Sequence, residues 1–190
     1  MTALITGATG GLGQEFAKLF AKDGHDLFLI ARRKDALEKI KSQLELEFNV
    51  KVTVLPLDLG LSDAPQTVFE FAAANNIKPE FLVNNAGFGD FGFFHESDLT
   101  KQENMIKLNI ITLTKLCRLF IPQLIEQGHG KILNVASIAS FMPSFFKADI
   151  ATTLQPSSFE SFSKSILSPF FFTMSIILIA TKVGKPISNN

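Results

Sequence analysis

The chain of 190 residues contains no tyrosine and no tryptophan, although it has 20 phenylalanines. It therefore has no phenol to donate or accept a proton, and its aromatic carbocycles offer only apolar surface. Cys117 is the single cysteine. This count excludes a disulfide within the chain and is typical of a reducing compartment. We accordingly expect a cytoplasmic protein.

An excess of one charge is also missing, because 18 Lys and Arg residues balance 18 Asp and Glu residues. No basic surface is predicted, and we expect no nucleic-acid partner. His25, His95 and His129 lie in different segments without cysteines or carboxylates at ligand spacing, so we predict no metal site. The first residues already read as a strand with no basic segment before it, and we expect no cleaved signal.

What the chain does have is a glycine-rich turn at its start, Thr6-Gly7-x-x-x-Gly11-x-Gly13. An apolar run precedes it, and a helical pattern begins near Leu12. A strand that turns through glycines into a helix directs backbone N–H groups and the helix dipole at an anion such as a phosphate. The spacing is neither that of G-x-G-x-x-G nor that of a P-loop. A plain tight turn is the alternative.

Strand and helix patterns alternate as far as residue 135. The sequence predicts strands at 3–5, 26–31, 50–57, 81–83 and 131–135, and helices at 14–22, 34–48, 63–75 and 99–126, the last with Pro122 as a late kink or break. Strands separated by helices predict an α/β fold with a doubly wound parallel sheet of the Rossmann type. Ligands of such folds bind at the carboxyl ends of the strands.

Small or polar residues follow each of these strands. Arg32 and Arg33 follow the second strand, where an acidic residue would favour a free ribose 2′-hydroxyl and arginine favours a 2′-phosphate. The pair therefore predicts NADP rather than NAD, with two solvated arginines at a helix start as the alternative. Asp58-Leu59 follows the third strand, Asn84-Asn85-Ala86-Gly87 the fourth and Ala136-Ser137 the fifth.

These motifs, in this order, resemble the short-chain dehydrogenase/reductase family of NAD(P)-dependent oxidoreductases over about residues 2–147. Asn109, in Lys107-Leu108-Asn109-Ile110, resembles the family's helix asparagine, and Asn134-Val135-Ala136-Ser137 its serine strand. The resemblance implies a sheet in the order 3-2-1-4-5. It assigns the cofactor contacts to Thr6, Gly7, Thr9, Gly11, Leu12, Gly13, Arg32, Arg33, Asp58, Leu59, Asn85, Ala86 and Gly87.

The same resemblance implies hydride transfer between a nicotinamide and an alcohol or ketone. In that family a tyrosine is the general acid/base and a lysine lowers its pKa and holds the ribose. Ser137 would orient the substrate oxygen, and Asn109 would fix a water of the proton relay. Phe88, Phe91, Phe93 and Phe94 could line an apolar substrate mouth, with core packing as the alternative.

The chain departs from the family where the catalytic tyrosine and lysine should stand. At the family's spacing these positions are Ile150 and Leu154, neither of which can transfer a proton or bind a ribose. If the codons of residues 152–157 are read two bases later, they can encode Tyr-Ala-Ala-Thr-Lys, a sequence typical of the family. Two interpretations follow, a local frame disruption and a diverged, non-catalytic relative.

We therefore divide the chain into a dinucleotide-binding domain, 1–147, and a diverged or frame-disrupted segment, 148–190. Residues 165–181 carry no charge. They are interpreted as a misread or buried tail, as a strand in the core, or as a membrane-associated segment. With the family's last third missing, the fifth strand is expected at an exposed sheet edge, and the family's homo-oligomer is doubtful.

The function predicted from these residues is that of an NADP-dependent oxidoreductase acting on a small carbonyl or alcohol, impaired in this chain. A non-catalytic nucleotide-binding or interaction protein is the first alternative. A nonfunctional fragment is the second.

Overall fold

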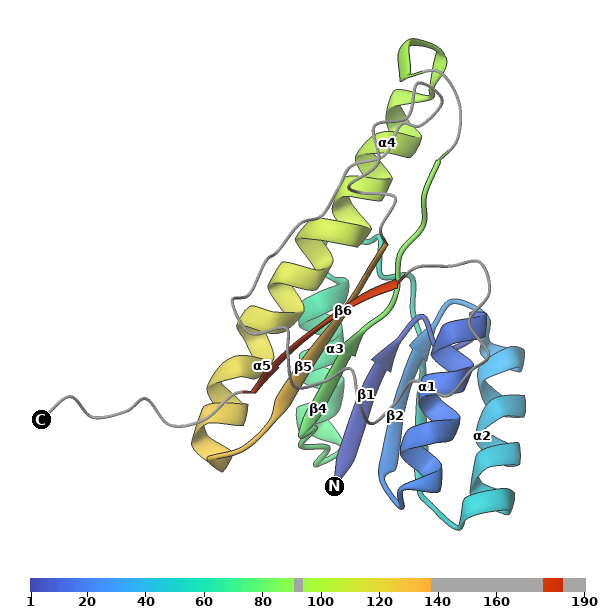
Figure 1. The fold of residues 1–190 in the computed structure, drawn as a ribbon, viewed down its shortest axis with the longest axis vertical. Helices are drawn as coiled ribbons and strands as arrows, with labels where there is room; N and C mark the ends of the chain where they lie inside the picture. Colours follow the sequence, from blue (N-terminus) through green and yellow to red (C-terminus); the bar gives the residue numbers. More distant parts are fainter. Residues whose placement is uncertain (91–93, 138–175, 183–190) are drawn as a thin grey trace, which may run out of the picture.

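The computed structural model describes residues 1–90, 94–137 and 176–182, and shows strands and helices alternating along the chain (Figure 1). The strands are β1 Thr2–Thr6, β2 Asp26–Ala31, β3 Val52–Pro56, β4 Phe81–Asn84, β5 Lys131–Ser137 and β6 Ile176–Lys182. The helices between them are α1 Gly11–Lys22, α2 Lys34–Phe48, α3 Ala64–Ala74, the short 3₁₀ helix η1 Phe94–Glu96, α4 Leu99–Ile106, the π-helix η2 Lys107–Thr112 and α5 Leu113–Gln127.

The strands form one sheet in the order β3-β2-β1-β4-β5-β6. The first five are parallel, so the order 3-2-1-4-5 and the doubly wound α/β fold are confirmed. The switch in strand order lies between β1 and β4. At such a point the connecting helices leave on opposite faces of the sheet, and a crevice opens at the carboxyl ends of the strands.

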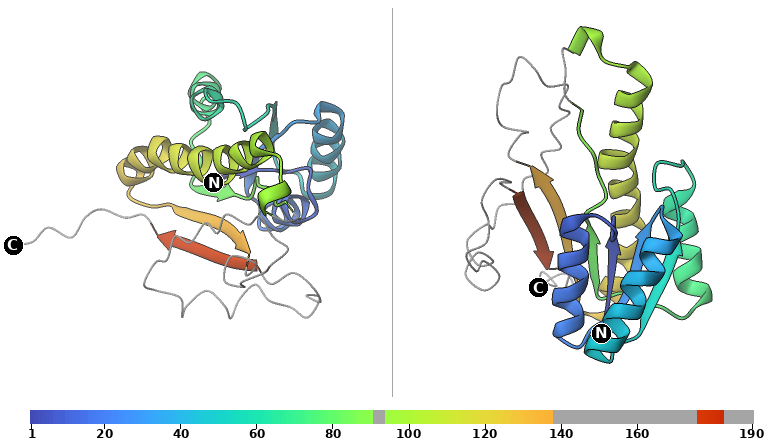
Figure 2. Two further views of the ribbon diagram at one scale, coloured as in Figure 1. Left: turned by 90° about the horizontal axis from the view of Figure 1, so that it is seen from above. Right: turned by 90° about the vertical axis from the view of Figure 1, so that its right-hand side faces the viewer.

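Helices cover both faces of the sheet, as the two views of Figure 2 show. On one face, Ala17 and Ala21 of α1 and Leu37 of α2 pack against β1 and β2. On the other, Val68 of α3 and Phe120 of α5 pack against Leu4, Phe28 and Leu82. The strands are thus apolar on both sides, as a parallel sheet between two helical layers requires.

The predicted long helix at 99–126 is one helical run with a π-helical segment in its middle, which periodicity alone does not predict. Pro122 lies inside α5, and the helix continues for five residues beyond it. Proline removes one N–H from the helical ladder, and here that loss does not end the helix. The helix ends instead at Gly128, whose left-handed φ of 77° suits glycine.

The expectation that β5 lies at an exposed edge is wrong. β6 pairs antiparallel with the whole of β5, from Lys131 opposite Lys182 to Ser137 opposite Ile176 (Figure 2). Residues 176–181 therefore form a strand, as one of the three interpretations proposed, and not a helical membrane span. The remainder of the uncharged segment, residues 165–175, lies outside the described residues.

Among the described residues one helical run, Leu99–Gln127, is long and apolar enough to cross a membrane. Core helices of soluble proteins pass the same test. Leu116, Phe120 and Leu124 of this run are buried in the core cluster on one face of the sheet. The Phe120 ring also meets the ring of Phe69 from α3 edge-on, with centroids 5.3 Å apart.

The packing of α5 on the sheet generates a stability prediction. Phe120→Ala should cost about 3–5 kcal/mol of unfolding free energy, because the side chain is 1% exposed and its removal leaves a cavity. Leu46→Ala on α2 is the control, since Leu46 is 89% exposed and its loss should change stability by less than about 0.5 kcal/mol. Urea unfolding followed by circular dichroism measures both. Equal effects of the two substitutions would contradict burial of α5 against the sheet.

Candidate cofactor and active site

The turn after β1 is built so that backbone can approach a ligand. Gly7 has φ +66°, and a Cβ on it would lie 2.9 Å from the Asn85 amide nitrogen and 3.0 Å from Ala86 Cα. Only glycine adopts this conformation at low cost and leaves this space. Gly13 brings α1 against the same turn, because a Cβ there would lie 2.3 Å from the Gly7 carbonyl oxygen.

The N-terminus of α1 offers free backbone donors. Its N-cap residue is Gly10, no side chain caps the helix, and its first turn contains no acidic residue. The first N–H groups of a helix have no partner within the helix, and they carry the positive end of the dipole. An uncapped helix start behind a glycine turn is suited to a phosphate, as the motif predicts.

Thr6 and Asn85 join the two strands on either side of the crevice. The Thr6 hydroxyl donates to the Val83 carbonyl at 3.2 Å and accepts from the backbone N–H groups of Asn85 and Ala86, both at 2.9 Å. The Asn85 side-chain amide donates back to the carbonyls of Thr6 at 3.0 Å and Gly7 at 3.3 Å. The hydroxyl of Thr6 is buried and fully paired, so it holds the turn in place.

The two arginines after β2 lie beside the glycine turn. Arg33 donates from Nη2 to the Thr9 carbonyl at 3.4 Å, and both Arg32 and Arg33 are exposed. Asp58, after β3, accepts from the Gly60 N–H at 2.9 Å, while the next residue, Leu59, is buried. The glycine turn, the two arginines and Asp58 thus follow the ends of three neighbouring strands, β1, β2 and β3, along one edge of the sheet.

Asn109 lies in the π-helix and faces the loop after β4. Its amide nitrogen donates to the Phe88 carbonyl at 2.9 Å, and its oxygen accepts from the Phe88 N–H at 3.2 Å. Gly87 permits this approach, because a Cβ there would lie 3.1 Å from the Asn109 oxygen. This pair of bonds ties the π-helix to Phe88, the residue that follows Asn85–Gly87.

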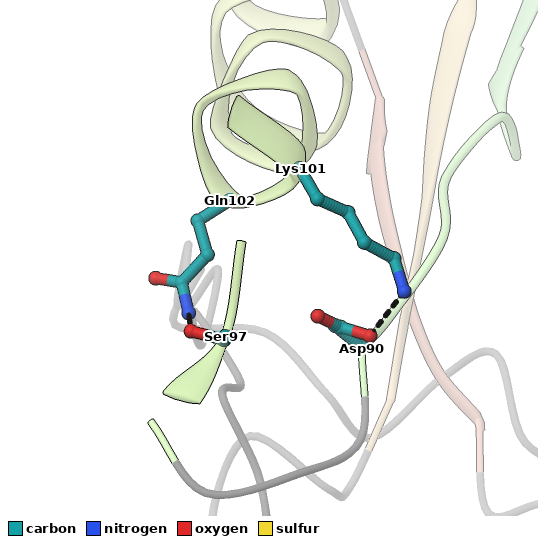
Figure 3. A network of polar contacts seen from close by, with 4 residues as sticks. All are labelled: Asp90, Ser97, Lys101 and Gln102. Carbon is teal, nitrogen blue, oxygen red and sulfur yellow. Dashed lines mark hydrogen bonds and ion pairs between the residues drawn. The ribbon is translucent and has the colours of Figure 1, made fainter. Parts of the chain in front are cut away.

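The loop that follows Phe88 is fastened to the start of α4 by two polar contacts, drawn in Figure 3. Lys101 forms an ion pair with Asp90, and Gln102 donates to the Ser97 hydroxyl (Figure 3). Asp98 caps α4 by accepting from the Thr100 N–H at 2.9 Å. Of the four predicted mouth residues, Phe88 is 38% exposed. Phe91 and Phe93 lie outside the described residues.

A polar cluster that motif reasoning missed lies where the carboxyl end of β4 meets the middle of β5. Asn84 and Asn134 stand opposite each other in the sheet, and the Asn84 amide donates to Asn134 Oδ1 at 2.9 Å and to Cys117 Sγ at 3.3 Å. Burial raises the pKa of the Cys117 thiol above its ordinary value, and the hydrogen bond with Asn84 lowers it in part. The thiol is therefore neutral at physiological pH. An asparagine at matching positions of two adjacent strands is the signal that could have revealed the pair.

Ser137 is the last residue of β5, three positions beyond Asn134 and at the same edge of the sheet as the glycine turn. Ile150 and Leu154 lie outside the described residues. Among the described residues no group of three or more His, Cys, Asp and Glu could hold a metal ion.

Comparison with known proteins identifies the class to which this fold and site belong. Residues 1–151 match the family model described as short chain dehydrogenase. The chain therefore belongs to the short-chain dehydrogenase/reductase family, as the resemblance of the motifs predicted.

Three relatives illustrate the match. The very-long-chain 3-oxoacyl-CoA reductase of Mus musculus is 29% identical over 197 residues, which is 96% of this chain and 61% of that protein. A short-chain dehydrogenase from Sphingobium yanoikuyae in complex with NADPH is 35% identical, with a TM-score of 0.70 over 76% of this chain and 56% of that one. The L-sorbose reductase from Gluconobacter frateurii, with NADPH and L-sorbose, is 29% identical, with a TM-score of 0.72 over 77% and 56%. The chain thus spans little more than half the length of these proteins.

The tight contact of α1 with the turn generates a prediction about two glycines of one helix. Gly13→Ala should destabilise the fold by about 1–3 kcal/mol, because the new Cβ meets backbone that cannot move aside cheaply. Gly11→Ala is the matched control, since a Cβ there meets nothing within 4 Å. It should be neutral or stabilise by up to about 1 kcal/mol through helix propensity. Thermal unfolding of both variants tests this, and a neutral Gly13→Ala would show that α1 does not rest on the turn.

Proposed function

We propose that this chain binds NADP(H) at the carboxyl edge of its sheet, in preference to NAD(H). One observation carries the proposal, namely the uncapped start of α1 behind the glycine turn, with Arg33 bonded to that turn. The backbone N–H groups of α1 would hold the pyrophosphate, and Arg32 and Arg33 a 2′-phosphate. Asp58 and Leu59 would border the adenine, and Asn85 to Gly87 the ribose side. The NADPH complexes of the two related structures support this choice.

The reaction that this family membership supports is reversible reduction of a carbonyl to an alcohol. Bound in this crevice, NADPH supplies the hydride that such a reduction needs. The chain's own part is to hold the substrate oxygen with Ser137 and to keep the loop at Asn85–Gly87 in place through Asn109. Because both amide atoms of Asn109 are occupied by Phe88, its side chain acts as a positioning group.

We further propose that this chain does not complete that reaction. A proton must reach the developing alkoxide, and general acid catalysis contributes about 10²–10⁴-fold to such steps. The chain contains no tyrosine, and the corresponding positions hold Ile150 and Leu154. The absence of the tyrosine also favours the second candidate function, that of a non-catalytic nucleotide-binding protein. An impaired oxidoreductase should regain turnover when the frame-corrected segment is restored, and a non-catalytic protein should not.

The substrate class remains the family's carbonyl or alcohol. The related proteins are named for substrates as unlike as a very-long-chain 3-oxoacyl-CoA and L-sorbose. The partly exposed ring of Phe88 at the rim of the crevice favours an apolar substrate for this chain.

Cofactor preference is tested by calorimetric titration of the unmodified chain with NADPH and NADH. NADPH should bind more tightly than NADH. Arg32→Asp should reduce the dissociation constant for NADH divided by that for NADPH at least about tenfold, because a hydrogen bond to a charged group is worth about 1.5–3 kcal/mol. Arg118→Asp, an equal charge change at an exposed position of α5, should leave the ratio unchanged. Equal binding of NADH and NADPH by the unmodified chain would refute the role of the arginines.

Turnover is tested by the absorbance of NADPH with a panel of small ketones and aldehydes. The unmodified chain should show no reduction, and Ile150→Tyr with Leu154→Lys should recover little, because the surrounding segment does not resemble the family. A chain carrying the frame-corrected segment should recover turnover. Activity of the unmodified chain that disappears in Ser137→Ala would show that another group supplies the proton.

A further inference from the structure

Asn84 carries a buried oxygen that the described residues leave unpaired. The side chain is 4% exposed, and its amide nitrogen uses both hydrogens, on Asn134 and Cys117. Its Oδ1 has no hydrogen-bond partner among the residues that the structure describes. A buried acceptor without a donor is costly, and in native proteins such groups are generally paired with protein or with ordered water.

A small cavity adjoins this residue. It offers about 10 Å³ to the centre of a water molecule, the lower end of what one water needs. Most of its wall is apolar, and three polar residues contribute to it: Thr6, Asn84 and Thr112.

The hydrogen-bond inventory of these three residues defines what the cavity can hold. Thr6 is saturated, because its hydroxyl donates once and accepts twice. The Thr112 hydroxyl donates its hydrogen to the Leu59 carbonyl at 2.8 Å, and its Oγ1 can still accept a hydrogen bond. Asn84 Oδ1 is thus an acceptor without a donor, and Thr112 Oγ1 can accept one further hydrogen bond.

We propose that one water molecule is bound in this cavity and donates to both Asn84 Oδ1 and Thr112 Oγ1. Water is the group of this size that supplies two donors, and an apolar occupant would leave Asn84 Oδ1 without a donor. The water links β4 to the π-helix, and through Thr112 to the segment after β3 at Leu59. Asn109 lies on the π-helix, Asn85 directly follows β4, and Asp58 lies in the segment after β3. The bound water is therefore a structural part of the floor beneath the candidate cofactor site, and its presence does not depend on the proposed function.

The unmodified full chain provides the first test. In water-selected NMR spectra of isotope-labelled protein, a long-lived water should give cross-peaks to the methyl groups of Thr112 and Leu116, which both line the cavity. A high-resolution crystal structure should show its density within hydrogen-bond distance of Asn84 Oδ1. A dry cavity would overturn the proposal, as would a structure with both amides turned over, in which the Asn134 nitrogen donates to Asn84 Oδ1.

Substitutions provide the second test, with Thr114→Val on the exposed side of α5 as the control for the same chemical change. Thr112→Val should abolish the water cross-peaks, Thr112→Ser should retain them, and Thr114→Val should leave them intact.

Asn84 and Thr112 share no direct hydrogen bond among those of the described residues. A double-mutant cycle of Asn84→Leu and Thr112→Val should nevertheless be non-additive by at least about twofold in the folding equilibrium constant. Additive costs together with unchanged cross-peaks in Thr112→Val would refute the bridge. If these variants fail to fold, the spectra of the unmodified chain decide.

Discussion

The hydrogen bonding between Thr6 and Asn85 is the constraint on which the rest of this site depends. It joins the carboxyl ends of β1 and β4 at the point where the strand order reverses, as part of a set of five side-chain hydrogen bonds between the two segments. The crevice is open only because neighbouring helices leave on opposite faces there. Without a fixed distance between these strand ends, the glycine turn on one side and the Asn85–Gly87 loop on the other could not face one ligand.

A second set of hydrogen bonds fixes the segments around Thr6 and Asn85. Asn109 holds the loop after β4, Thr112 holds the segment after β3, and Asn84 joins β4 to β5. Asn109 and Thr112 both belong to the π-helix and are three residues apart. π-helical turns occur frequently at functional sites, and this one contacts the loops after both β4 and β3.

The sequence predicts the fold well because strand and helix periods are local properties. The patterns at 26–31 and 34–48 coincide with β2 and α2 as observed. The π-helix is not predicted, because apolar periodicity does not distinguish it from an α-helix. The contact of Asn84 with Cys117 is not predicted either, because the two residues are distant in sequence. Likewise, the motif marks Thr6 as a site residue, but only the structure shows that its hydroxyl makes all its hydrogen bonds within the protein. β6 follows from no family pattern, since it runs against the direction of the other strands.

The antiparallel β6 also limits what else this sheet can accept. β4 pairs with one edge of β5, which leaves the other edge for a second neighbour. β6 pairs with all seven residues of β5 along that other edge. A parallel neighbour delivered by a right-handed crossover would need the same N–H and C=O groups. The two arrangements therefore exclude each other. A longer chain of this family, in which another parallel strand followed β5, would have to release the segment 176–182 before its own sheet could grow.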